Sequence, residues 1–379
     1  MIRAFRAGKL FDGNRLRPGA ALLVEDGQVA AVAPPGEALP AGVAVEDLGA
    51  GLLAPGLIDL QVNGGGGEML GAATDAAQIA RICAVHARLG ATGILPTLIT
   101  DTPEVTARVV AAGIAAARAS VPGFLGLHLE GPHLDPRRAG AHDPALIRPM
   151  TEADLAALEA AARALPALLV TLAPEAATAD QIARLALAGA VVSLGHSDCG
   201  PHAAEAAFAA GARAVTHLFN AMSQLQGRAP GLVGAALAAP VHAGIIADGV
   251  HVADAALRTA LAAKAPDRLF LVSDAMAVAG TDLAAFDLGA RRIERVGGRL
   301  TLADGTLAGA DITLPLALAH LVRLGCPPVR TLAMATRIPA GLIGASDHGV
   351  LGPGSRADFV HLSDDMDLRA VWRAGTRLA

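Results

Sequence analysis

VVSLGHSDCGPHAAEAAFAAGARAVTHLF, residues 191–219, contains a strand-like run, a helix-like run and a second strand-like run in succession. The two strand-like runs, 191–195 and 214–218, are apolar, and the segment between them is rich in alanine. A strand, a helix and another strand in this order predict a parallel βαβ unit. A histidine, His196 or His217, lies at the end of each strand-like run.

The same alternation extends on both sides of this unit and gives eight strand-like runs. These runs are 57–62, 93–98, 123–129, 168–172, 191–195, 214–218, 242–247 and 269–273. The helix-like segments between them include 75–89, 102–119, 152–164, 179–188 and 202–209. Eight strands alternating with helices predict an α/β fold with a parallel (β/α)8 TIM-type barrel. We expect residues 55–347 to form this barrel.

Both ends of the chain consist of short β-like runs separated by turn residues. Asp26 and Gly27 lie between two apolar runs, which is a strong hairpin signal. Further strand-like runs near the C-terminus are 357–362 and 370–375. We therefore expect residues 1–54 and 348–379 to pair into a small β-sandwich domain beside the barrel.

Composition narrows the class of protein. Of the 379 residues, 53% are hydrophobic and 17% charged, which is typical of a folded domain. The apolar runs are interrupted well before the ~20 residues that a membrane-spanning helix needs, so no membrane partner is expected. A net charge of −5 gives no electrostatic footprint for nucleic acid. Three scattered cysteines, and a start without a secretory signal, indicate a cytoplasmic protein.

Polar residues cluster where the predicted strands end, which is where barrel enzymes build their active sites. These residues include Asp59, Gln61, Asn63, Glu130, His196, His217, Asn220, Asp248, His251 and Asp274. Glu130, His196 and His217 offer a carboxylate and two imidazoles from three strands, the ligand set of a catalytic zinc site. Singly, each has a plainer interpretation, as a loop histidine or a turn-capping glutamate. Three equivalent positions favour one shared metal.

Other candidate residues keep two interpretations. Asp274 is either an N-cap or the general base that metal-assisted hydrolysis needs, and we favour the base. His142 and His251 either bind a substrate oxygen or satisfy loop backbone, and the sequence does not separate the two. Arg228 either grips a phosphate with its planar guanidinium or is a solvated surface residue.

Six segments together carry a resemblance to a known family. They are Pro55–Asp59 (PGLID), Leu127–Pro132 (LHLEGP), Gly195–Ser197 (GHS), Thr216–Met222 (THLFNAM), Ala247–His251 (ADGVH) and Val272–Ala275 (VSDA). They resemble the motifs of the N-acetylglucosamine-6-phosphate deacetylases, within the amidohydrolase superfamily, and the match runs almost the whole chain. The Glu-Gly-Pro and His-Leu-Phe-Asn-Ala-Met segments are the most specific.

The resemblance implies hydrolysis of the acetamide of N-acetylglucosamine-6-phosphate to glucosamine-6-phosphate and acetate. It implies Glu130, His196 and His217 as metal ligands and Asp274 as the catalytic acid and base. The substrate contacts that it implies are Ala141, His142, Asn220, Ala221, Arg228, His251 and the backbone of Leu307, Ala308 and Gly309. Since the family's counterpart of Arg228 holds the phosphate across a dimer interface, a homodimer with Arg228 near the interface is expected.

One departure from the superfamily pattern concerns the metal. Many amidohydrolases carry His-x-His after the first strand, where this chain has Gln61-Val62-Asn63. Because amides are poor zinc ligands, we expect one divalent ion per subunit, Zn²⁺ first, with Fe²⁺, Co²⁺ or Mn²⁺ as alternatives. A related deacylase or cyclic-amide hydrolase acting on a non-phosphorylated substrate is the competing function, and a non-catalytic barrel scaffold is the third.

Overall fold

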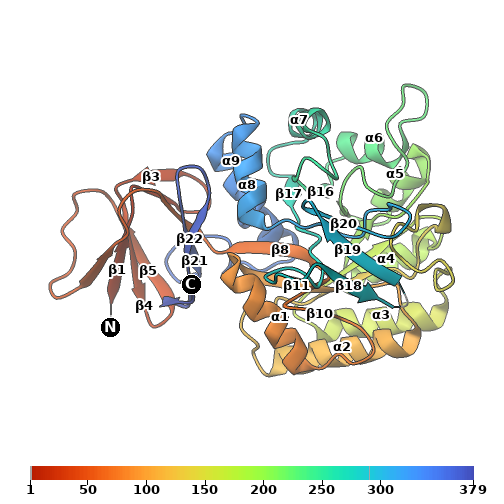
Figure 1. The fold of residues 1–379 in the computed structure, drawn as a ribbon, viewed down its shortest axis with the longest axis horizontal. Helices are drawn as coiled ribbons and strands as arrows, with labels where there is room; N and C mark the ends of the chain where they lie inside the picture. The colour runs from red at the N-terminus through yellow and green to blue at the C-terminus, as the bar shows by residue number, and fades with distance from the viewer. Residues whose placement is uncertain (1, 290) are drawn as a thin grey trace.

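The barrel is an eight-stranded parallel sheet with the strand order β17-β16-β15-β14-β13-β12-β11-β8. The computed structural model describes residues 2–289 and 291–379 (Figure 1). The barrel strands are β8 (Leu57–Val62), β11 (Ala91–Ile99), β12 (Leu127–Glu130), β13 (Leu168–Leu172), β14 (Val191–Leu194), β15 (Ala214–Val215), β16 (His242–Ile245) and β17 (Leu269–Leu271). Each corresponds to one of the expected runs, so the predicted α/β barrel is confirmed.

Hydrogen bonds and a β-bridge join the first strand to the segment that follows the last strand. The Ser273 backbone N–H donates to both carboxylate oxygens of Asp59, at 3.1 and 3.2 Å. The Asp274 backbone N–H donates to the Gln61 carbonyl over 3.0 Å. A parallel bridge pairs Val62 with Ala275. The residues just after β17 are therefore held against β8, and Asp274 is fixed beside the end of the first strand.

Helices pack around the barrel. They are α1 (Ala76–Arg88), α2 (Pro103–Arg118), α3 (Glu152–Ala164), α4 (Ala179–Leu187), α5 (Pro201–Ala209), α6 (Gly231–Ala238), α7 (Asp254–Ala263), α8 (Leu314–Arg323), α9 (Pro328–Met334) and α10 (Arg337–Leu342). Several begin at a residue that can cap them: Thr151 and Thr178 each form a capping box with the third helical residue. No helix in the described part of the chain is long and apolar enough to cross a membrane.

The two ends of the chain form the small β domain, as expected (Figure 1). One sheet has the order β5-β4-β1-β6 and the other β23-β22-β21-β7-β2-β3. The strands of the first sheet are β1 (Arg3–Arg6), β4 (Ala21–Glu25), β5 (Gln28–Ala33) and β6 (Ala44–Asp47). Those of the second are β2 (Lys9–Phe11), β3 (Leu16–Pro18), β7 (Leu52–Pro55), β21 (Phe359–Leu362), β22 (Leu368–Arg373) and β23 (Thr376–Arg377).

An aromatic cluster fills the core of this domain. Phe5 from the first sheet meets Phe359 and Trp372 from the second at ring-centroid distances of 4.9 and 5.8 Å. β7 pairs antiparallel with β21, so the N-terminal and C-terminal segments share one sheet. The domain boundaries at 54/55 and 347/348 stay a prediction.

Two small β elements near the strand ends were not expected from the sequence. β9 (Gly64–Gly65) and β10 (Glu68–Met69) form a short hairpin after β8. β18 (Ala285–Leu288), β19 (Arg291–Val296) and β20 (Arg299–Thr301) form a three-stranded antiparallel sheet between β17 and α8. A separate apolar cluster that includes Met276, Phe286, Ile293 and Leu300 anchors this sheet beside the mouth of the barrel.

Candidate active site

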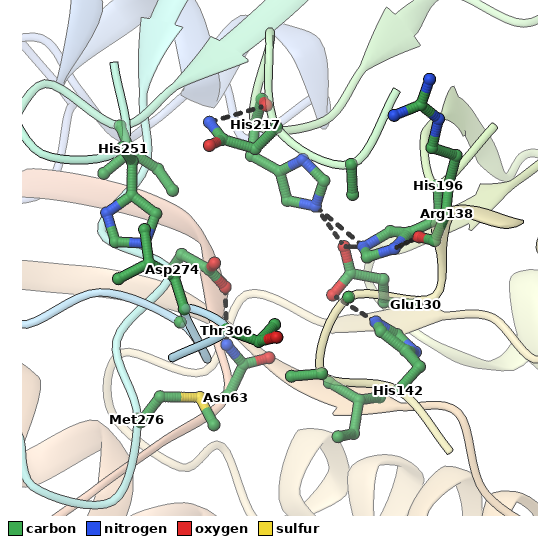
Figure 2. A pocket seen from close by; sticks show the side chains of 18 of the residues that line it. Asn63, Glu130, Arg138, His142, His196, His217, His251, Asp274, Met276 and Thr306 are labelled. Carbon is green, nitrogen blue, oxygen red and sulfur yellow. Dashed lines mark hydrogen bonds and ion pairs between the residues drawn. The ribbon is translucent and has the colours of Figure 1, made fainter. Parts of the chain in front are cut away.

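A cavity of about 520 Å³ opens where the barrel strands end (Figure 2). The candidate residues that line it are Asn63, Glu130, Ala141, His142, His196, His217, Asn220, Ala221, His251, Asp274, Leu307 and Gly309. Residues separated by up to 246 positions in the chain therefore meet in one place. The side chains of Glu130, His196 and His217 converge on one side of this cavity, and Asp274 and His251 face them from the other.

Unusual backbone conformations place three of these residues. His196, His217 and Asp274 follow β14, β15 and β17 directly or within a few residues, and their φ angles are 46°, 21° and 51°. Positive φ angles are costly for residues other than glycine, of order 1–3 kcal/mol each, and persist where the surroundings enforce them. The bend re-aims each side chain as its strand ends. Such strain at three strand ends is typical of a functional site.

The tautomer of His196 follows from its hydrogen bond. His196 Nδ1 lies 2.8 Å from the Arg138 carbonyl oxygen, which can only accept, so Nδ1 carries the proton. The Nε2 lone pair of neutral His196 then faces the cavity. A backbone carbonyl that fixes an imidazole in this way is the usual support of a metal-binding histidine.

The metal-ligand candidates form a tight triangle. Glu130 Oε1 lies 3.0 Å from His217 Nε2 and 3.4 Å from His196 Nε2, and the two Nε2 atoms are 3.0 Å apart. The circle through these atoms has a radius of about 1.8 Å, so a point about 2 Å from all three exists, which is the distance at which zinc binds nitrogen and oxygen. Lone pairs that converge this closely repel one another unless a cation or a proton lies among them. The donor set therefore fits a divalent ion.

His142 is the competing third ligand. With Glu130 and His196 it forms a group whose potential ligand atoms lie within 4.8 Å of one another, and its Nε2 is 3.7 Å from Glu130 Oε2. However, the Thr100 backbone N–H donates to His142 Nδ1 over 3.2 Å. Neutral His142 therefore carries its proton on Nε2, and burial lowers its pKa to about 4. We interpret His142 as an N–H donor that faces the cavity.

The charges around the triangle act on Glu130. Burial alone would raise the pKa of this carboxyl, but the three neighbouring imidazoles, of His142, His196 and His217, hold the pKa well below its usual range. Glu130 is therefore ionised and ready to bind a cation. Gln61, buried beneath the cavity, adds a donor: its Nε2 lies 3.0 Å from Glu130 Oε1.

Asp274 is a second carboxylate with a different environment. Its Oδ1 accepts a hydrogen bond from Asn63 Nδ2 over 2.7 Å. Burial first, and then the negative charge of Glu130, raise the pKa of Asp274 to about 6. A carboxyl with a pKa near the working pH can both take up and release a proton, which suits a general acid and base.

His251 lies beside Asp274, on the same side of the cavity (Figure 2). Its Nδ1 donates to Asp248 Oδ2 over 2.6 Å, and two backbone N–H groups, of Val250 and His251, donate to Asp248 Oδ1. Burial, the largest single effect, raises the pKa of Asp248, but the contacts with His251 and the two backbone N–H groups together lower it below its usual value. His251 Nε2 is buried without a hydrogen-bond partner in the described structure, which leaves it free for a substrate atom.

Three candidates do not line the cavity. Gln61 lies below it, and Ala308 packs its side chain into the apolar cluster of the β18–β20 sheet. The Ala308 backbone N–H is also bonded to the Leu300 carbonyl. Arg228 lies on an exposed segment after β15, outside the cavity of its own chain.

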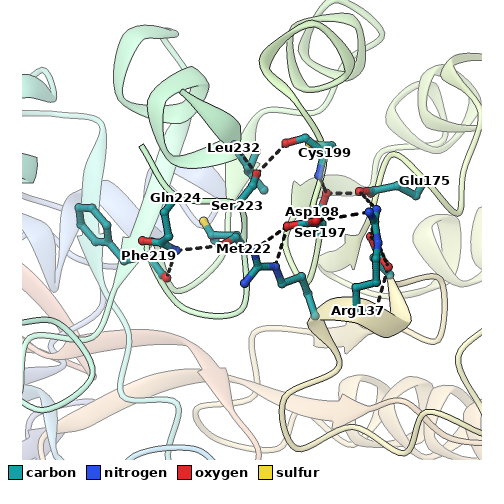
Figure 3. Close-up of polar contacts among 12 residues, drawn as sticks. Arg137, Glu175, Ser197, Asp198, Cys199, Phe219, Met222, Ser223, Gln224 and Leu232 are labelled. Atoms are coloured by element: carbon teal, nitrogen blue, oxygen red, sulfur yellow. Dashed lines mark hydrogen bonds and ion pairs between the residues drawn. The ribbon is translucent and has the colours of Figure 1, made fainter. Parts of the chain in front are cut away.

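Two arginines at the cavity mouth were missed at the sequence level. Arg137 and Arg138 line the cavity from the short 3-10 helix Pro136–Arg138. Arg137 contacts Asp135, Glu175 and Asp198 at 2.5, 3.5 and 3.3 Å (Figure 3). Arg138 Nη2 lies 2.6 Å from Asp198. Their position between Glu130 and His142 in the chain was a signal that could have found them.

The comparisons with known proteins agree with this geometry. The amidohydrolase family model matches residues 52–378. The chain belongs to the amidohydrolase family. One fold can carry active sites for different reactions, so membership of this family does not by itself give the substrate. Individual relatives give more specific information.

Among its amidohydrolase relatives, the N-acetylgalactosamine-6-phosphate deacetylase of Shewanella sp. (strain ANA-3) is 40% identical over 333 residues, which cover 87% of this chain and 84% of the relative. The human N-acetylglucosamine-6-phosphate deacetylase is 37% identical over 347 residues, with the same two coverages. The crystal structure of N-acetylglucosamine-6-phosphate deacetylase from Pasteurella multocida superposes with a TM-score of 0.95 at 32% identity and covers 100% of this chain and 99% of that one.

Proposed function

We propose that this protein hydrolyses the acetamide of N-acetylglucosamine-6-phosphate to glucosamine-6-phosphate and acetate. The names of the deacetylase relatives support this choice of substrate, and the residues that line the cavity support metal-assisted hydrolysis. The proposal depends on the triangle of Glu130 Oε1, His196 Nε2 and His217 Nε2, with sides of 3.0 to 3.4 Å, and on Asp274, which lines the same cavity outside this triangle.

We assign Glu130, His196 and His217 as the ligands of one divalent ion per subunit. Zn²⁺ is the expected ion, and Fe²⁺, Co²⁺ and Mn²⁺ are alternatives for the same nitrogen and oxygen ligand set. When bound, such an ion polarises the acetamide carbonyl and makes an adjacent water more acidic.

Asp274 is assigned as the group that moves the proton. As the oxygen of a water attacks the acetamide carbon, the Asp274 carboxylate accepts a proton from that water. The carbon–nitrogen bond then breaks, and Asp274 gives the same proton to the departing nitrogen. The remaining proton of the water ionises from the acetic acid product. Asn63 holds the Asp274 carboxylate through its Nδ2–H during both transfers.

The other lining residues are assigned to the substrate. The Nε2–H of His142 is suited to donate to the developing oxyanion. His251, Asn220 and Ala221, with the 307–309 segment, are assigned to the sugar and its phosphate. Ala308 is assigned through its backbone alone.

We also propose a cytoplasmic homodimer in which Arg228 reaches the phosphate in the neighbouring subunit. The exposed position of Arg228, outside the cavity of its own chain, supports this arrangement. A guanidinium matches phosphate oxygens with two parallel hydrogen bonds. Three free, buried cysteines are in keeping with a reducing compartment.

The test is acetate release from N-acetylglucosamine and N-acetylgalactosamine, each with and without a 6-phosphate. Turnover of the phosphorylated sugars alone is the expected result. Because the Shewanella relative is named for the galactosamine substrate, N-acetylgalactosamine-6-phosphate is the second candidate. Equal turnover of the unphosphorylated sugars, with no rise in KM on Arg228→Ala, would instead favour a deacylase of neutral amides. Absence of release from all four would refute the proposal.

A further inference from the structure

A chain of hydrogen bonds runs beneath the candidate metal ligands. The Thr216 hydroxyl donates from Oγ1 to Gln61 Oε1 over 2.6 Å, and Gln61 Nε2–H donates to Glu130 Oε1 over 3.0 Å. All three side chains are at most 4% exposed. A threonine hydroxyl can rotate to donate, whereas an ionised carboxylate can only accept, so the two ends of the Gln61 amide have opposite partners.

This polarity fixes the orientation of the amide. If the Gln61 amide were turned over, its carbonyl oxygen would face the Glu130 carboxylate and two acceptors would repel each other in a buried place. Thr216 stabilises the observed orientation because its hydroxyl proton needs an acceptor and finds it in Gln61 Oε1.

The oxygen that receives the Gln61 N–H is the one that completes the triangle. Glu130 Oε1 is the atom that lies 3.0 Å from His217 Nε2 and 3.4 Å from His196 Nε2. We propose that Thr216 is a positioning residue, which orients the Gln61 amide so that the amide holds Glu130 Oε1 toward the two imidazoles. This role depends on the ligand set of the proposed function.

Packing keeps the Thr216 hydroxyl in place. A Cβ at Gly195 would lie 2.4 Å from Thr216 Cγ2 and 2.9 Å from Thr171 Cγ2. The Thr216 methyl group therefore occupies the space beside Gly195 that a side chain would need. With its methyl group held there, the hydroxyl of Thr216 is left pointing at Gln61.

The metal dissociation constant of Thr216→Val, measured by competition with a chelator, tests the role. Valine keeps the shape of threonine and removes the hydroxyl, so the ion should bind about 10- to 100-fold more weakly, the range for residues that support ligands. Thr216→Ser keeps the hydroxyl but loses the methyl group that packs beside Gly195, so its loss of metal affinity should be smaller than that of Thr216→Val. Thermal unfolding of the metal-free proteins checks that both variants fold.

A double-mutant cycle separates an effect through Gln61 from a general disturbance. Gln61→Leu should weaken metal binding by a similar factor, and Thr216→Val should add nothing in that background. Wild-type affinity in Thr216→Val, equal losses in Thr216→Ser and Thr216→Val, or additive losses in the double variant would each overturn the role. If Thr216→Val does not fold, Gln61→Leu alone decides, and wild-type affinity there overturns it. Metal retained in Glu130→Gln would instead refute the ligand set itself.

Discussion

Two buried carboxylates in one cavity have opposite properties because their neighbours differ. Burial raises the pKa of both groups, but three imidazoles hold the pKa of Glu130 low. For Asp274, burial and then the charge of Glu130 raise the pKa to about 6, although the Asn63 amide acts in the opposite direction. Carboxyl groups whose pKa values are pushed apart mark the division between binding an ion and moving a proton.

Asp274 is the proposed proton carrier. Asp274→Asn keeps the size of the side chain and removes its ability to accept a proton, so kcat should fall about 10²- to 10⁴-fold. The metal content should stay at the wild-type value, because Asp274 is outside the triangle of ligand atoms. Elemental analysis beside initial rates checks both, and a variant that turns over at the wild-type rate would remove Asp274 from this role.

The second prediction concerns pH. Activity should fall as the pH drops through about 6, since protonated Asp274 cannot accept a proton from water. The Asn63 N–H favours the ionised form, so Asn63→Ala should raise the pKa of Asp274 and move the acid limb of the kcat/KM profile to higher pH. Metal content measured at each pH is the control. A limb that stays in place or moves to lower pH would contradict this assignment.

The sequence predicted which residues form the candidate site, but it did not predict which residues form hydrogen bonds with them. Glu130, His196, His217 and Asp274 were expected because each follows an apolar run, and the cavity brings them together. Nothing in the sequence indicated a role for Thr216, because threonine is common in strands of every kind. Only the fold reveals that its hydroxyl meets an amide 155 positions away.

The positions of the strands were predicted well from the sequence, but the backbone conformation just after each strand was not. Strand position follows from apolar runs, so all eight were located within a few residues. The positive φ angles of His196, His217 and Asp274 depend on tertiary contacts that enforce them. The β18–β20 sheet escaped prediction because its strands are short and half exposed, with a weak alternation of apolar residues.

The chain segments that follow β14 and β15 are in close contact at Gly195 and Thr216. Gly195→Ala would place a methyl group 2.4 Å from Thr216 Cγ2, so either the Thr216 side chain or the strand ends must shift. We expect a loss of about 1–3 kcal/mol in the free energy of unfolding together with weaker metal binding. Gly71→Ala, where a Cβ meets nothing within 4 Å, is the matched control and should change stability by about 0.5 kcal/mol or less. Equal behaviour of the two variants in thermal unfolding would contradict the strand-contact explanation.

Within residues 2–289 and 291–379, the arginines that line the cavity are Arg137 and Arg138. Arg137 and Arg138 at the mouth are already paired with Asp135, Glu175 and Asp198. Arg228 is on an exposed segment with Leu225, whose side chain is 52% exposed. Arginine and exposed apolar side chains are both common in subunit interfaces, so this segment suits the proposed dimer contact.

Mixed dimers test whether Arg228 acts across that interface. Arg228→Ala and Asp274→Asn should each be nearly inactive alone at low substrate concentration. If Arg228 serves the neighbouring site, a dimer with one subunit of each kind contains one complete site, because the Asp274→Asn subunit lends its arginine to the subunit that keeps Asp274. Co-expression in equal amounts should then restore about a quarter of the wild-type activity, since half of the dimers are mixed and each has one working site. If the arginine served its own chain, no mixed dimer would contain a complete site, and the activity of the mixture would stay at the sum of the two inactive parents.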